Sequence, residues 1–138
     1  MANSTSIQIL EDGPRNVVLK LEGVLDTSDL TSTVVVDPAT LSQIDSFGNP
    51  ATQLRIDHVL FNIEDSLSVN LFWDATTPVR IEQLVGRGTV DYAWFGGLPN
   101  NSGAGKTGKI TATTSNTGAA ISATNILSFS LIIKMVKQ

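Results

Sequence analysis

The amino-acid sequence predicts an all-β protein: an antiparallel β-sandwich of the jelly-roll or Greek-key type with eight to nine strands. Apolar and polar residues alternate with a period of two in many short segments, as they do along strands with one buried face. The chain holds 13 Ser and 15 Thr but only 16% charged residues, a composition that suits strands and turns better than helices. No βαβ pattern is present, which excludes the parallel nucleotide-binding folds.

The clearest alternation runs over residues 125–136. A helix is excluded there because β-branched residues and Ser are poor helix formers. Its first face is wholly apolar, and its second face is mixed. The first face carries Leu127, Phe129, Leu131, Ile133 and Met135, and the second still carries Ile126, Ile132 and Val136. We expect these last three residues to contact a second subunit, with a core covered on both faces as the alternative.

A second strand is predicted over residues 53–62, with Leu54, Ile56, His58 and Leu60 on one face. Asp65 and Ser66 then form the turn of a predicted hairpin to a strand over residues 68–73. Residues 79–84 alternate again. The other expected strands cover residues 7–10, 17–21, 33–36, 91–95 and 109–114, and a short helix or turn covers residues 38–44 behind Asp37 as a possible N-cap.

The 138 residues are enough for one domain, because domains cluster at about 100–150 residues. No linker or internal repeat divides the chain. We therefore expect a single β-sandwich domain over residues 7–138, preceded by an N-terminal arm over residues 1–6. The arm is polar and uncharged, and its residues Ala2, Asn3, Ser4 and Thr5 are candidates for adding a strand to a neighbouring subunit. Residues 98–108 form a loop without apolar anchors, and such loops are usually functional or mobile.

Composition excludes several classes of function. The chain has no Cys, so disulfides, thiolate metal sites and Cys nucleophiles are absent, and a single His excludes a multi-His metal centre within one chain. A net charge of −4 argues against nucleic-acid binding, which needs a basic stripe. No segment is apolar enough for a membrane span, and no signal peptide is recognisable. We expect synthesis in a cytoplasm.

No motif predicts catalysis or a cofactor. Gly103–Thr107 resembles the end of a phosphate-binding loop, but the earlier glycine is replaced by Asn100 and a strand follows instead of a helix. His58 follows Asp57 within a predicted strand, so the two side chains point to opposite faces and Asp57 cannot readily orient His58 as a catalytic triad requires. The acidic pairs at Asp26 and Asp29 and at Glu64 and Asp65 lack a calcium-loop pattern. We expect no enzyme and no bound cofactor or metal.

Aromatic residues are the remaining candidates for a binding surface. Tyr92 and Trp94 share one face of the expected strand over residues 91–95. In an assembly they would anchor a subunit contact, because Trp and Tyr are enriched at interface hot spots. In a carbohydrate-binding module they would stack on sugar rings if they are exposed and coplanar. Packing in the core is the third alternative.

Residues 7–20, Ile-Gln-Ile-Leu-Glu-Asp-Gly-Pro-Arg-Asn-Val-Val-Leu-Lys, resemble small virion structural proteins of tailed bacteriophages. The similarity continues through Gly-Val-Leu-Asp-Thr-Ser-Asp at residues 23–29 and Val-Asp-Pro at residues 36–38. It covers about the first 40 residues and is closest to capsid decoration, or cement, proteins. Such proteins are typically β-sandwiches that bind the outer capsid, often as trimers, and stabilise the expanded shell. No binding residues can be transferred from this likeness.

The resemblance implies a decoration protein on the capsid surface of a virion, with the major capsid protein as partner and a homotrimer as the expected oligomer. A carbohydrate-binding module is the first alternative. Another virion part, such as a head–tail connector or a tail protein, is the second, and a ring of six or twelve subunits would distinguish it from a trimer.

Overall fold

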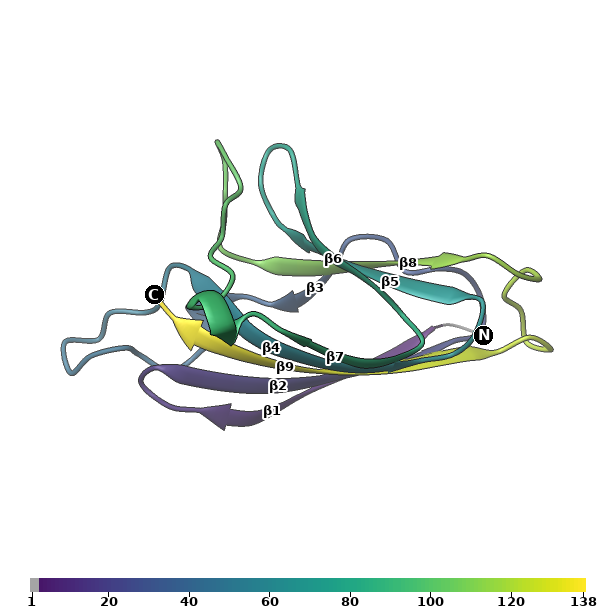
Figure 1. Cartoon of the computed structure of the whole chain (residues 1–138), viewed down its shortest axis with the longest axis horizontal. Coiled ribbons are helices and arrows are strands. Elements are labelled where there is room, and N and C mark those ends of the chain that lie inside the picture. Colours follow the sequence, from purple (N-terminus) through teal and green to yellow (C-terminus); the bar gives the residue numbers. More distant parts are fainter. Residues whose placement is uncertain (1–2) are drawn as a thin grey trace.

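The computed structural model describes residues 3–138 and confirms the β-sandwich: two antiparallel sheets lie face to face (Figure 1). The five-stranded sheet has the order β1-β2-β9-β4-β7, and the four-stranded sheet has the order β3-β8-β5-β6. The strands are β1 (Ser4–Asp12), β2 (Asn16–Leu25), β3 (Thr33–Val36), β4 (Leu54–Ile63), β5 (Leu67–Trp73), β6 (Val79–Val85), β7 (Arg87–Asp91), β8 (Ile110–Asn116) and β9 (Leu127–Lys137), and two short 3₁₀ helices are η1 (Pro38–Thr40) and η2 (Ala93–Phe95).

The strand order is that of a jelly roll. β2 pairs with β9, β3 with β8, β4 with β7 and β5 with β6, so the pairs are nested from the outermost to the innermost strand. This nesting results when one long hairpin is wound into two layers. β1 is an additional strand that does not belong to these four nested pairs. It pairs with β2 and extends the five-stranded sheet by one strand at that edge.

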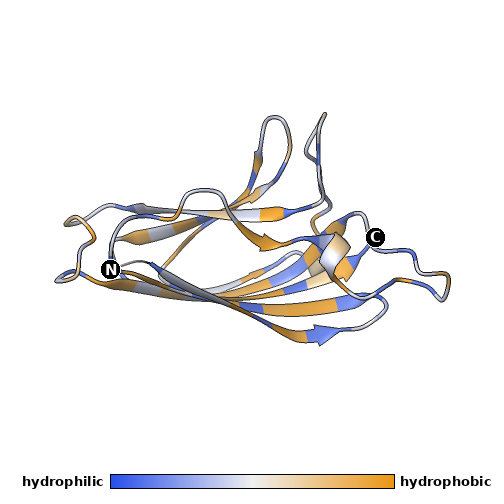
Figure 2. Ribbon diagram, turned by 180° about the vertical axis from the view of Figure 1, so that it is seen from behind, coloured by the Kyte–Doolittle hydropathy of each residue, from blue (hydrophilic) through white to orange (hydrophobic). Residues whose placement is uncertain are grey.

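The core lies between the two sheets, where the inward faces of the strands meet. Figure 2 shows the apolar residues alternating with polar ones along the strands. In β2 and β9 the buried residues Leu19, Leu21, Leu131 and Ile133 follow the period of two that predicted these strands. Trp73, at the end of β5, is the largest fully buried side chain. The fold therefore rests on apolar burial across two layers.

β4 differs from its predicted faces because the pairing register with β9 shifts between Ile56 and His58. A bulge of this kind adds one unpaired residue and reverses the alternation beyond it. Leu54 and Ile56 face the core as predicted, but beyond the bulge Val59 is buried instead of His58. The predicted face of β4 is therefore wrong from His58 onwards.

The predicted hairpin through Asp65 and Ser66 is also wrong. A turn is present there, and Ser66 adopts a positive φ of 69°. However, β4 lies in the five-stranded sheet and β5 in the four-stranded sheet, so this turn carries the chain from one layer to the other. The same turn residues suit a hairpin within one sheet and a connection between two sheets. The sequence alone therefore does not distinguish these two kinds of turn.

Residues 91–95 do not form the predicted strand. β7 ends at Asp91, and a hydrogen-bonded turn follows that contains η2. Gly96 and Gly97 both have φ near +95°, a conformation that glycine adopts without the strain that a Cβ atom would cause. The amide of Gly97 donates to the carbonyl of Tyr92 at 2.9 Å, which closes the turn.

Two further segments differ from expectation. Residues 4–6 belong to β1 and pair with Glu22, Gly23 and Val24, so they are not a free arm. The short helix or turn expected over residues 38–44 is the 3₁₀ helix η1, where Asp37 Oδ1 accepts a hydrogen bond from the amide of Ala39 at 3.0 Å as the predicted N-cap.

The loop over residues 98–108 is anchored to the sandwich. Leu98 exchanges two backbone hydrogen bonds with Ile56, at 2.8 and 3.0 Å. Farther along, the amide of Thr107 donates to the carbonyl of Asp74 at 3.1 Å, and the Thr107 hydroxyl donates to the Asp74 carboxylate at 2.8 Å. The loop then enters β8, so Gly103–Thr107 precedes a strand and not a phosphate-binding helix.

Candidate functional site

Three exposed aromatic side chains make up the candidate site, which we call the aromatic end. Phe47 is 88% exposed, Trp94 is 81% exposed and Phe95 is about half exposed. The segment between η1 and β4, which carries Phe47, and η2, which carries the other two, lie toward the same end of the long axis in both overall views (Figures 1 and 2). Large exposed aromatic side chains are typical of protein interfaces.

Both aromatic segments begin with an aspartate that accepts a backbone hydrogen bond. Asp91 Oδ1 accepts from the amide of Ala93 at 2.8 Å, and Asp45 Oδ1 accepts from the amide of Phe47 at 2.9 Å. The Asn49 side chain and the Phe47 amide donate to Asp45 and hold the pKa of its carboxyl below its usual range. The aromatic end therefore combines exposed rings with carboxylates held by their own turns.

Tyr92 fixes the base of the η2 turn instead of joining its exposed surface. Tyr92 is buried, and its hydroxyl donates to Glu82 Oε2 at 2.8 Å. Burial first, and then the hydrogen bond and negative charge of Glu82, raise the pKa of the Tyr92 phenol well above its usual value. The ring of Phe95 meets Tyr92 and Trp94 edge to face, with centroids 6.1 and 4.9 Å away.

The prediction that Tyr92 and Trp94 share one strand face is therefore wrong. The pair was expected on one strand face, but the chain turns after Asp91, so one ring packs inward and the other points into solvent. A flat, two-ring surface for sugar stacking is not formed by these residues. Trp94 remains a candidate contact, with the Phe95 ring 4.9 Å away between centroids and with Phe47 on a separate segment toward the same end of the long axis. Sequence reasoning missed Phe47 because its loop has no periodic pattern.

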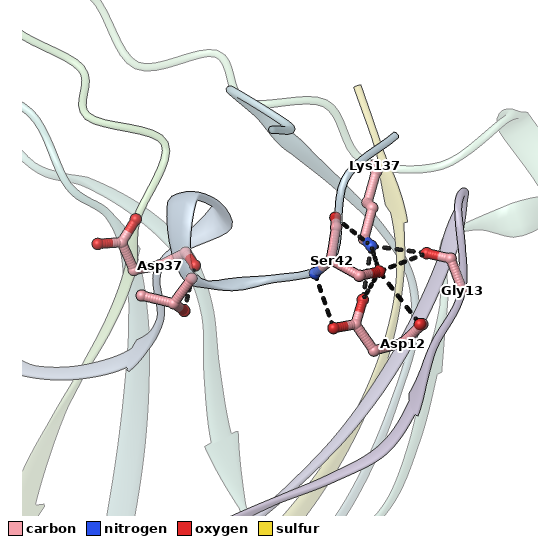
Figure 3. Close-up of polar contacts among 6 residues, drawn as sticks. Asp12, Gly13, Asp37, Ser42 and Lys137 are labelled. Atoms are coloured by element: carbon pink, nitrogen blue, oxygen red, sulfur yellow. Dashed lines mark hydrogen bonds and ion pairs between the residues drawn. The ribbon is translucent and has the colours of Figure 1, made fainter. Parts of the chain in front are cut away.

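The cluster in Figure 3 holds three segments together near the same end. Lys137 has no exposed side-chain area, and its Nζ lies 2.5 Å from Asp12 Oδ1, 2.6 Å from the carbonyl of Gly13 and 2.8 Å from both the carbonyl and the hydroxyl of Ser42. Asp12 Oδ2 also accepts from the amide of Ser42 at 2.8 Å. The buried ammonium is thus surrounded by oxygen acceptors, as a buried charge requires.

These contacts set the ionisation of Asp12. Burial raises the pKa of its carboxyl, but the hydrogen bonds from Lys137 and Ser42 and the charge of Lys137 together outweigh burial and lower it. Lys137 and Asp12 belong to no sequence motif that marks a site. No local signal could have indicated their pairing, because the two residues are 125 positions apart.

The outward face of β9 is only partly available for contacts. Ile126, just before the strand, is exposed, and Ile132 is half-buried opposite the exposed Leu60 of β4. Val136 is 4% exposed, so the expectation that it contacts a partner is wrong.

A cleft of about 730 Å³ lies around Asn62, Arg87 and Ser130. Its lining carries both signs of charge and does not define one ligand.

The N-terminal candidates are fixed in place. Asn3 Oδ1 accepts from the amides of Asp26 and Thr27 at 3.1 Å, and its Nδ2 donates to the carbonyl of Ser28 at 2.8 Å. Ser4 and Thr5 pair with β2. Ala2 lies outside the described residues. These contacts hold the start of β1 against β2, and the rest of the strand follows along the sheet edge.

The ionisable side chains described in this paragraph do not gather into a metal or catalytic site. Within residues 3–138, no three His, Asp or Glu side chains gather as a metal site would require. Asp57 accepts from Arg55 Nε at 3.2 Å, whereas His58 lies in the ladder between Asp91 and Lys134. No helix within this part of the chain is long and apolar enough to cross a membrane.

Comparisons with family models, with curated proteins and with solved structures found no match to this chain. The candidate site therefore rests on geometry alone: a β-sandwich that presents exposed aromatic rings on hydrogen-bonded turns toward one end of its long axis.

Proposed function

We propose that this protein is a capsid decoration protein that binds the outer surface of a bacteriophage capsid as an oligomer and stabilises the shell. The observation that carries the proposal is the aromatic end, where Trp94 and Phe47 are more than four-fifths exposed on structured turns. The resemblance of residues 7–20, 23–29 and 36–38 to virion structural proteins supplies the proposed class of partner. On this proposal the protein resides on the virion.

The major capsid protein is the proposed partner. Trp94, Phe95 and Phe47 would enter apolar pockets on it, as aromatic anchors do at interface hot spots. Asp45 and Asp91 flank these rings, so the matching capsid surface would carry basic residues around its apolar pockets. Each contact would be modest, and the stabilisation of the shell would come from many copies acting together.

A binding assay on phage heads tests this proposal. Purified heads lacking the protein would be mixed with the wild-type chain, pelleted, and scanned for their thermal disruption temperature. We expect saturable binding and a higher disruption temperature. Trp94→Ala should weaken binding by about tenfold or more, as expected for an interface hot spot. Val85→Ala is the matched control, because Val85 is exposed on the four-stranded sheet.

Four results would contradict the proposal. Absence of binding to heads, or binding that leaves their thermal disruption unchanged, would exclude a decoration role. Equal loss of binding in both variants would show that the aromatic end is not the contact. Rings of six or twelve copies in solution would favour a head–tail connector or tail protein instead.

A further inference from the structure

The outer edge of β1 is a strand edge without a partner. β1 pairs only with β2, and each residue from Ser4 to Glu11 is exposed. Every second residue of such an edge directs its N–H and C=O groups away from the sheet. We propose that two copies of this chain associate through this edge, with their β1 strands antiparallel about a two-fold axis at Ile7.

Along residues 4–9 the edge lacks the features that keep strands apart. Natural edge strands are protected by charged side chains, by Pro, by β-bulges or by a covering segment. The register shift of β1 against β2, between Ile9 and Glu11, lies at the end of this stretch. Residues 4–10 read Ser-Thr-Ser-Ile-Gln-Ile-Leu and contain neither a charge nor Pro. No backbone hydrogen bond links β1 to any described segment other than β2. The strand is therefore a ready template for β-augmentation.

The other three edge strands in the described residues are shorter than β1 or carry charged side chains. β7 has five residues, with Arg87 at one end and Asp91 at the other, and β3 has only four residues. β6 has seven residues and carries the charged side chains of Arg80 and Glu82. Of the four edges in residues 3–138, β1 alone presents seven consecutive uncharged residues.

Self-pairing explains the pattern of charge along β1. With Ile7 opposite its own copy, Thr5 faces Ile9 and Ser6 faces Gln8, and the regular pairing ends at the register shift after Ile9. The acidic Glu11 and Asp12 then fall beyond the uncharged stretch, so no two carboxylates face each other directly. This matters for a chain of net charge −4, because like charges directly opposite one another destabilise a strand pair.

The apolar side chains of β1 lie where a second copy would cover them. Ile7 pairs with Leu21 and Ile9 with Leu19, so both point to the core side of the five-stranded sheet. Leu19 and Leu21 are buried, whereas Ile7 is 44% and Ile9 47% exposed, because β1 has no strand opposite it in the nested pairs. A second copy would place Ile7 against Ile7 and Ile9 against Thr5, extending the apolar face across both molecules.

The pairing predicts a dimer, not the trimer expected from the resemblance. Light scattering on a sizing column should give twice 14.7 kDa. Ile7→Lys places two ammonium groups opposite each other and should raise the dimer dissociation constant about tenfold or more. Because Ile7 is exposed in the single chain, the variant should keep the wild-type far-UV spectrum. Val85→Lys adds the same charge on β6 and should remain dimeric.

Cross-linking tests the register independently. The chain has no Cys, so Ile7→Cys introduces a single thiol that would face its own copy across the axis. Mild oxidation should link this variant into covalent dimers at micromolar concentration. In Gln8→Cys the two thiols are diagonal neighbours about 7–8 Å apart between Cα atoms, so linkage should be at least tenfold slower, because a disulfide needs closer Cα atoms.

A wild-type mass of one or three chains would overturn the proposal. So would a dimer that survives Ile7→Lys, a dimer that is lost equally in Val85→Lys, or equal cross-linking of the two Cys variants. These measurements use the protein alone. A dimer that fails to bind heads would leave the pairing intact and exclude only the capsid function. Head binding by a monomer would exclude the pairing and leave the contact with the capsid intact.

Discussion

Lys137 Nζ and Asp12 Oδ1 lie 2.5 Å apart and join the end of β9 to the end of β1. The lysine side chain has no exposed area, whereas the aspartate side chain is 24% exposed. The pair is therefore asymmetric: one charge depends wholly on protein acceptors, and the other can still be hydrated.

We expect Asp12→Ala to destabilise the fold more than Lys137→Met does. Asp12→Ala leaves a buried ammonium without its counter-ion and should lower the free energy of unfolding by about 2–4 kcal/mol. Lys137→Met removes the buried charge and leaves an aspartate that solvent and Ser42 can still bind, so the loss should be about 0–2 kcal/mol. Urea unfolding of both variants and of the double variant measures the difference. An equal loss in the two single variants would contradict this asymmetry.

Acid should weaken the same cluster. The pKa of Asp12 is lower in the folded protein than in the unfolded chain, because its hydrogen bonds and the charge of Lys137 outweigh burial. Its contribution to stability is complete above the unfolded value of about 4 and declines as the pH falls through the folded value. The difference in Tm between wild type and Asp12→Asn should therefore narrow below about pH 4. A constant difference from pH 7 to pH 2 would refute the assignment.

Tyr92 should resist ionisation at alkaline pH. It is the only tyrosine, so tyrosinate absorbance at 295 nm reports this residue alone. Burial and Glu82 raise its folded pKa, so the stability it contributes is full below the unfolded value of about 10 and falls as the pH rises beyond it. Tyrosinate should appear only well above pH 10 or upon unfolding. Ionisation near pH 10 in the folded protein would place the ring in solvent.

Gly23 should not accept a side chain. A Cβ atom there would come within 2.4 Å of the Phe129 ring, which lies across from it in the β2–β9 pair. Gly23→Ala should therefore cost about 1–3 kcal/mol through overpacking. Gly103→Ala is the control, because no heavy atom lies within 4 Å of its added Cβ. Thermal unfolding distinguishes the two variants, and a neutral Gly23→Ala would show that Phe129 moves aside freely.

Much of the fold could be predicted because strand periodicity is local. Eight predicted strand segments overlap strands of the structure, and the ninth was misplaced by the turn after Asp91. The errors arise where a non-local contact decides the outcome. The bulge at Asp57 depends on pairing with β9, and the destination of the turn at Ser66 depends on which sheet receives β5.

The candidate site was less predictable. Trp94 was identified by residue type, but its exposure depends on Tyr92 turning inward to reach Glu82. Ile7 and Ile9 have the alternation of a buried strand face, and nothing in their spacing indicates that the covering layer ends before β1. Exposure of this kind depends on sheet order, which period-two patterns do not encode.

The position of β9 has a consequence for how the protein folds. This strand is the last in sequence, yet it lies between β2 and β4 in the middle of its sheet. Until it inserts, β2 and β4 both expose unpaired edges, and the loop that must close spans most of the chain. Non-local pairing of this type slows folding to milliseconds or seconds. During that interval the two open edges favour aggregation, so refolding yield should fall as protein concentration rises.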